Sequence, residues 1–140
     1  MTDRLSSQVI SPERARGLDP LVLAYVGDGV ETLWVRTHFA LEAPTDSAGK
    51  LHRKTVGVVS AEAQAKGADA ILDLLSEEER DVYRQARNHK TKSGAKNATV
   101  GDYHKATGLE AVWGYLYLTG RQERLDELLA LATGLTEGKV

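Results

Sequence analysis

The sequence has no cysteine, which excludes disulfide bonds and metal sites built on thiolates. It has three prolines, and none follows Pro44, so most of the chain is free of helix breakers. No segment approaches the roughly 18 consecutive apolar residues of a membrane span. The first residues do not combine a basic segment with an apolar one, as a secretory signal does. We therefore expect a cytoplasmic protein.

The 140 residues are enough for one hydrophobic core and too few for two ordinary domains. Hydrophobic residues make up 41% of the chain and charged residues 27%, which is typical of a soluble globular protein rather than a disordered one. The composition thus predicts a single folded domain.

The charges are segregated, although the net charge is only −2. Residues 80–105 carry seven basic and two acidic side chains, and residues 50–66 carry four and one. The rest of the chain carries seven basic and 17 acidic side chains. Such segregation can form a basic face that attracts a phosphate backbone, or it can reflect two ordinary solvated helix faces.

The apolar spacing predicts an all-α fold. Asp19 and Pro20 are a typical helix start, Ser60 is a second cap, and Ser76 with Glu79 forms a capping box. Thr99 repeats the cap signature. The expected helices span about 20–40, 46–57, 61–75, 77–88, 100–119 and 122–132. Residues 1–17 should be a flexible lead-in and 133–140 a tail, residues 88–98 should form a mobile loop, and 56–59 is a weak strand candidate.

Two acidic residues stand in the middle of the two most apolar predicted helices. Asp28 lies in the sequence LAYVGDGV and Glu110 in TGLEAVWGYLYL. Both are flanked by small residues, including four glycines that each cost a helix about 1 kcal/mol relative to alanine. Close helix approach would explain the glycines, and so would space for an ion beside the carboxylates. The glycines are Gly27, Gly29, Gly108 and Gly114.

Two interpretations of these acids are open. Each could point separately into solvent, as lone acids usually do. If the helices instead pack with Asp28 and Glu110 facing each other, the pair offers hard oxygen ligands. Mg²⁺ suits such a site because it typically takes one or two carboxylates and keeps several waters.

The same stretches resemble the ribonuclease III family. Residues 23–30 are similar to the signature helix of its catalytic domain, and residues 107–118 to its second acidic helix. The closer resemblance is to Mini-ribonuclease III, the subgroup without a double-stranded-RNA-binding domain. It covers roughly residues 18–132, which would be the catalytic domain. Further matching segments are 51–53 (LHR), 59–66 (VSAEAQAK), 87–88 and 122–128 (QERLDEL).

The resemblance implies that Asp28 is the catalytic aspartate and Glu110 the metal-binding glutamate, with both holding Mg²⁺ and with Mn²⁺ able to substitute. Other ribonuclease III enzymes have additional acids where this chain has Leu21, Ala24 and Thr107. This reduced acidity is usual in the Mini subgroup and puts a second metal in doubt. Thr107 could hydrogen-bond a metal-bound water or, equally, satisfy a backbone carbonyl.

The implied activity is that of a dimeric endoribonuclease that hydrolyses double-stranded RNA and leaves 5′-phosphates, 3′-hydroxyls and short 3′ overhangs. The implied natural substrate is 23S ribosomal RNA precursor. A non-catalytic helical RNA-binding module and a purely structural helical dimer are the alternatives. The candidate RNA-binding residues are His89, Lys90, Lys92 and Lys96 in the predicted loop, and Arg53, Lys54 and Lys105 outside it.

The homodimer prediction has a second basis in three aromatic residues of one helix. Trp113, Tyr115 and Tyr117 cannot all share one helical stripe, so part of the set could cover a partner. Ordinary core packing explains them equally well.

Overall fold

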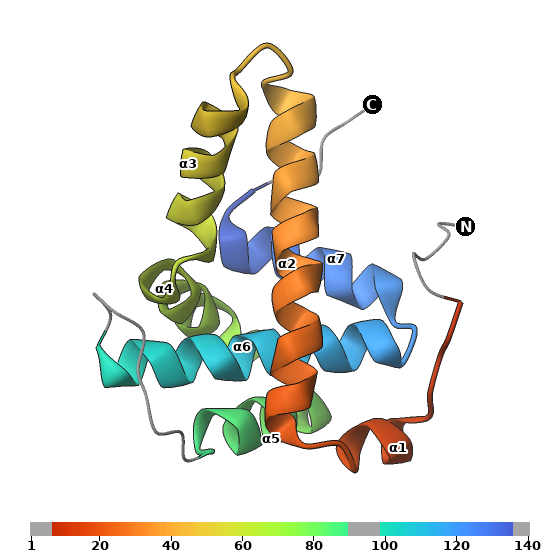
Figure 1. The fold of residues 1–140 in the computed structure, drawn as a ribbon. Helices are drawn as coiled ribbons and strands as arrows, with labels where there is room; N and C mark the ends of the chain where they lie inside the picture. Colours follow the sequence, from red (N-terminus) through yellow and green to blue (C-terminus); the bar gives the residue numbers. More distant parts are fainter. Residues whose placement is uncertain (1–6, 90–98, 136–140) are drawn as a thin grey trace.

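The computed structural model describes residues 7–89 and 99–135, and in these ranges it contains helices and no strand. The predicted all-α fold is confirmed (Figure 1). The helices are α1 (Pro12–Arg16), α2 (Pro20–Glu42), α3 (Ala48–Val59), α4 (Ala61–Ile71), a 3₁₀ turn η1 (Leu72–Leu74), α5 (Glu77–Arg87), α6 (Val100–Leu118) and α7 (Gln122–Thr133).

The helix starts follow the predicted caps. The Asp19 carboxylate accepts a hydrogen bond from the Leu21 amide at 2.7 Å, directly before α2. The Ser60 and Thr99 hydroxyls cap α4 and α6 in the same way. At the start of α5, the Ser76 hydroxyl accepts from the Glu79 amide while the Glu79 carboxylate accepts from the Ser76 amide. Local sequence therefore determines where these helices begin.

Two segments differ from the sequence prediction. Residues 12–16 form a helix within the predicted lead-in, because Ser11 caps it, Pro12 starts it and Ala15 is fully buried. Residues 56–59 belong to α3, so the weak strand candidate is wrong. The predicted mobile loop falls largely on residues 90–98, which lie outside the described residues.

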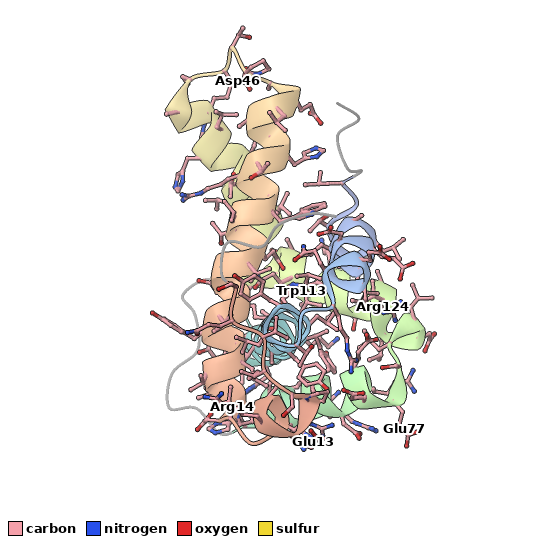
Figure 2. The ribbon with its side chains drawn as sticks, turned by 90° about the vertical axis from the view of Figure 1, so that its right-hand side faces the viewer. Glu13, Arg14, Asp46, Glu77, Trp113 and Arg124 are labelled. Atoms are coloured by element: carbon pink, nitrogen blue, oxygen red, sulfur yellow. The ribbon has the colours of Figure 1, made fainter. Side chains whose placement is uncertain are left out.

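Helix α6 forms the centre of the fold. Helices α2, α4, α5 and α7 all pack against it, and the view along α6 in Figure 2 places Trp113 in the middle of this arrangement. The side chains of Trp113 and Tyr115 are fully buried and Tyr117 is partly buried. For Trp113 and Tyr115, core packing is therefore the correct interpretation.

Helices α2 and α6 approach each other closely at two glycines. A Cβ on Gly27 would lie 1.7 Å from the carbonyl oxygen of Glu110, and one on Gly114 would lie 1.9 Å from the carbonyl oxygen of Leu23. A Cβ on Gly108 would meet the Tyr83 ring at 2.8 Å. Close packing thus explains these three glycines, whereas a Cβ on Gly29 would meet nothing within 4 Å.

Among the described residues, no helix has the length and hydropathy of a membrane span. The C-terminal end of α2 extends together with α3 beyond the rest of the bundle (Figure 1). The two helices pack against each other there, and Asp46 lies in the turn between them. The acidic residue Asp28 lies nearer the start of α2, directly after Gly27, which packs against the α6 backbone.

Candidate active site

The crossing of α2 and α6 brings Asp28 and Glu110 together. The Asp28 carboxyl group lies close enough to Glu110 to share a hydrogen bond with it, although 82 positions of sequence separate them. Asp28 is exposed and Glu110 is partly buried, so the pair opens toward solvent. The structure therefore agrees with the interpretation in which the two acids face each other.

The Glu110 carboxyl group is strongly perturbed. Burial, followed by the hydrogen bond and the negative charge of Asp28, raises its pKa to about 9. A carboxyl group with this pKa holds a proton at neutral pH. A cation placed between the carboxyl groups would reverse this effect by favouring both ionised forms.

A third acid, Glu31, lies beneath the pair and was missed by the sequence reasoning. It lies one helical turn after Asp28, but its exposed fraction is 1%. Its Oε1 accepts a hydrogen bond from the Trp113 indole Nε1 at 2.6 Å, and its Oε2 accepts one from the Gln64 amide at 3.2 Å. Burial raises the pKa of Glu31 to about 7, against the effect of these two hydrogen bonds. In the sequence, the only indication that Glu31 is buried is its position among the apolar residues of α2.

Gln64 links the buried acid to the exposed pair. Its Nε2 donates to Glu31 and lies 3.4 Å from Oε2 of Glu110. The side chain comes from α4 and is 5% exposed. Residues 59–66 contributed to the family resemblance, yet nothing in that segment indicated a contact with either acid.

Of the two roles predicted for Thr107, the structure shows the hydrogen bond to a backbone carbonyl. Its side chain is buried, and its hydroxyl donates to the backbone carbonyl of Tyr103 at 3.0 Å. The donor capacity of Thr107 is therefore used within its own helix.

The described basic candidates differ in their surroundings. Lys54 Nζ lies 2.8 Å from Asp46, and Lys105 Nζ lies 3.0 Å from both carboxylate oxygens of Asp69. Arg53 is exposed on α3. His89 is partly buried, with Nε2 3.8 Å from Asp19. Lys90, Lys92 and Lys96 lie outside the described residues.

The donor set suits a hard divalent cation. Asp28, Glu31 and Glu110 make no ion pair with a basic residue in the described part of the chain. Within residues 7–89 and 99–135, no three His, Cys, Asp or Glu side chains are arranged to hold a metal ion. A centre with two carboxylates and several waters is the one that fits, and Mg²⁺ commonly has such a shell.

Comparison with known proteins decides the family. The model of the Ribonuclease III domain matches residues 21–121, a range that contains both acids. The chain belongs to the ribonuclease III family. The predicted resemblance to Mini-ribonuclease III is also confirmed, since several curated relatives carry that name. A Clostridium tetani "Mini-ribonuclease 3" is 43% identical over 86% of this chain and 80% of its own length. One from Thermoanaerobacter is 42% identical over 94% and 92%.

A solved structure supports the same fold. A crystal structure of a protein from Fusobacterium nucleatum superimposes with a TM-score of 0.74 and 28% sequence identity. The match covers 81% of this chain and 90% of the other. The chain thus has the ribonuclease III architecture over most of its length, with Asp28 and Glu110 inside the matched domain.

Proposed function

We propose that Asp28 and Glu110 form the catalytic centre of an endoribonuclease that hydrolyses double-stranded RNA, with Mg²⁺ as the metal. Family membership supports the enzyme class, the duplex substrate and the need for a divalent metal. The contact between Asp28 on α2 and Glu110 on α6 is the observation that carries the assignment of the site.

Both carboxylates would hold the ion, directly or through water, and Mn²⁺ has the same preference for oxygen ligands. When bound, such an ion lowers the pKa of water and polarises a phosphoryl oxygen, which phosphodiester hydrolysis requires. Thr107 is proposed only as a neighbour of this centre, because its hydroxyl proton is donated to Tyr103.

The proposed roles of Asp28 and Glu110 differ because the two side chains differ in burial. Asp28 is exposed, so an ion that it holds would be accessible to the scissile phosphate. Glu110 is partly buried and must lose its proton to become a ligand. Its backbone carbonyl lies against Gly27 at the close α2–α6 crossing, which fixes the backbone of Glu110 beside the residue that precedes Asp28. The products would carry 5′-phosphate and 3′-hydroxyl ends.

The proposed RNA contacts come from the basic segments. An A-form duplex is recognised largely through its backbone and shape, which favours accessible Lys and Arg side chains. Arg53 is supported by its exposure. The ion pairs of Lys54 and Lys105 weaken their candidacy, because binding a phosphate would compete with Asp46 and Asp69. His89 and the loop lysines Lys90, Lys92 and Lys96 complete the proposed set, with 23S ribosomal RNA precursor in the cytoplasm as the proposed natural substrate.

We also propose that the enzyme acts as a homodimer, through the exposed face of α2. Tyr25 is 83% exposed, and Val22 and Leu33 on the same helix are 45% and 48% exposed. Gly29 lies in the same stretch, with open space where its side chain would be. An apolar face of this kind fits a second copy of the chain, and two sites would explain cutting of both strands.

The division into a catalytic domain at residues 18–132, a lead-in at 1–17 and a tail at 133–140 remains part of the proposal. Helix α1 packs on α6, so the lead-in contributes to the fold through residues 12–16.

Incubation of the protein with duplex RNA, with and without Mg²⁺, tests the proposed function. We expect Mg²⁺-dependent cleavage by the natural chain and none by Asp28→Asn, which keeps the size of the side chain but removes its charge. Glu42→Gln is the matched control, because Glu42 is exposed near the far end of the same helix. Cleavage by Asp28→Asn would remove Asp28 from its role, and binding without cleavage by the natural chain would favour an RNA-binding module.

A further inference from the structure

The site contains a hydrogen-bonded chain of side chains that the catalytic proposal does not use. It begins at the Trp113 indole on α6, passes through Glu31 on α2 and Gln64 on α4, and ends at Glu110 on α6. Three of the helices that form the centre of the fold thus contribute to it. Trp113 and Glu31 are at most 1% exposed and Gln64 is 5% exposed, so a polar chain lies in a nearly dry part of the protein. Buried polar groups at this depth cost stability unless they are fully paired.

We propose that Gln64 is a positioning residue for Glu110, and that Glu31 and Trp113 fix the orientation of its amide. This inference rests on the proposed role of Glu110 as a ligand of a divalent ion. It assigns no direct contact with substrate or metal to Gln64, Glu31 or Trp113.

The first step of the argument is the orientation of the Gln64 amide. A carboxylate only accepts hydrogen bonds, whereas an amide NH₂ group has two protons to donate. The Gln64 Nε2 lies 3.2 Å from Glu31 Oε2 and 3.4 Å from Glu110 Oε2, so one proton can be directed to each. With a cation bound, Glu110 is ionised, and the opposite orientation would then place the amide oxygen against two carboxylates, which is unfavourable.

The second step is the anchor of Glu31. The Trp113 indole has a donor and no acceptor, and its fully buried ring directs that N–H group to Glu31. Its 2.6 Å hydrogen bond occupies Oε1 of Glu31 and leaves Oε2 for Gln64. Because both oxygens are occupied and the side chain is buried, Glu31 is placed to orient Gln64 rather than to hold an ion.

The third step is the effect on Glu110. A donor aimed at Oε2 fixes the orientation of the carboxyl group and leaves Oε1 as the oxygen available to a cation. The 3.4 Å separation is long for a hydrogen bond, as is common for active-site contacts before their ligand binds. Partners that hold a metal ligand in place typically contribute about 10- to 100-fold to metal affinity.

Calorimetry of Mg²⁺ binding to the whole chain, in the absence of RNA, tests the proposal. We expect Gln64→Leu to weaken Mg²⁺ binding by about 10- to 100-fold. Glu31→Gln should have a similar effect. The Trp113 N–H group would still donate to the side-chain oxygen at position 31, so the NH₂ group introduced there would face Gln64. Because that NH₂ group donates rather than accepts, the Gln64 amide would turn its oxygen toward it and its NH₂ group away from Glu110. The matched controls, Gln122→Leu in the Gln122–Asp126 pair of α7 and Glu42→Gln on α2, should bind Mg²⁺ normally.

The double variant Glu31→Gln/Gln64→Leu separates positioning from direct ligation. If Glu31 acts through Gln64, the double variant binds Mg²⁺ no more weakly than Gln64→Leu alone. If Glu31 is an independent ligand, the two effects multiply and the proposal is overturned. Unchanged Mg²⁺ affinity in Gln64→Leu overturns it as well. If Glu31→Gln does not fold, Trp113→Phe removes the same anchor and takes its place in the comparison.

Two further measurements separate this proposal from a structural role and from the proposed function. Cleavage by Gln64→Leu should recover at high Mg²⁺ concentration, at a temperature where urea unfolding in a metal chelator shows the variant to be fully folded, so that stabilisation by the ion does not account for the recovery. Asp28→Asn should not recover. Cleavage by Asp28→Asn would contradict the catalytic assignment itself, while an inactive Asp28→Asn beside a Gln64→Leu variant with normal Mg²⁺ affinity would contradict the positioning role alone.

Discussion

A Cβ on Gly27 would lie 1.7 Å from the carbonyl oxygen of Glu110, so the α2 backbone lies directly against the residue that is proposed to hold the metal. Gly27→Ala must separate α2 from α6, since the obstructing atom is backbone and cannot rotate away. We expect the free energy of unfolding to fall by about 3 kcal/mol or more. Urea unfolding of the metal-free protein measures this change.

The same substitution elsewhere provides the control for Gly27→Ala. A Cβ on Gly57, in the exposed surface of α3, would meet nothing within 4 Å. Gly57→Ala should therefore leave the stability unchanged or raise it by up to about 1 kcal/mol through helix propensity. Equal effects of the two substitutions would show that the close α2–α6 approach does not require a glycine at position 27.

The raised pKa of Glu110 predicts how stability depends on pH. Glu110 titrates near 9 in the folded protein and near 4.5 in the unfolded chain. Between these values the folded state holds a proton that the unfolded state has lost, so the free energy of unfolding decreases as pH rises from about 5 to about 9. Glu31, with a pKa of about 7, contributes only to the lower part of this range. Urea unfolding in a metal chelator, repeated across this range, measures the slope.

Mg²⁺ and Glu110→Gln provide the controls for the pH experiment. The ion binds the ionised carboxylates, so its stabilising effect should grow over the same pH range. Glu110→Gln removes the proton of Glu110 and should flatten the metal-free curve above about pH 7. A natural chain with the same flat curve would contradict the raised pKa of Glu110.

The helix starts could be predicted from the sequence because the caps are local. Ser60, Ser76 and Thr99 each accept a hydrogen bond from an amide three residues ahead, and such spacing is visible in a single sequence. Helix α1 was missed because five residues are too few to show a helical period, and the burial of Ala15 decides its place. Glu79 shows both cases: its capping box was predicted, but its ion pair with Arg124 on α7 was not.

Part of the candidate site could also be predicted from the sequence, and part could not. Asp28 and Glu110 could be predicted because a charged residue in the middle of an apolar helix is unusual. The roles of Glu31 and Gln64 could not be predicted, since they depend on which faces of α2, α4 and α6 meet. Periodicity gives the apolar face of one helix, whereas a hydrogen bond between helices is fixed only by their packing.

The exposed face of α2 predicts a dimer that one charge should disrupt. Tyr25 is 83% exposed, so Tyr25→Glu changes nothing inside the folded chain. In a dimer, however, it would bury an unpaired carboxylate at the interface, which costs several kcal/mol. We expect the natural chain to sediment as a dimer and Tyr25→Glu as a monomer. Leu131→Glu, at a 51% exposed position on α7, should remain dimeric. A natural chain that sediments as a monomer would contradict the proposed homodimer.

The basic residues predict how RNA binding depends on salt. Each phosphate contact that is lost should reduce the slope of log affinity against log salt concentration by about one. Replacing Lys90, Lys92 and Lys96 together by alanine should therefore lower the slope by up to about three, measured with duplex RNA in metal-free buffer. Lys105→Ala is the matched control, because Lys105 already bonds both oxygens of Asp69 and should change the slope by less than one. An unchanged slope in the triple variant would assign RNA binding to other residues, with Arg53 on α3 the first to test.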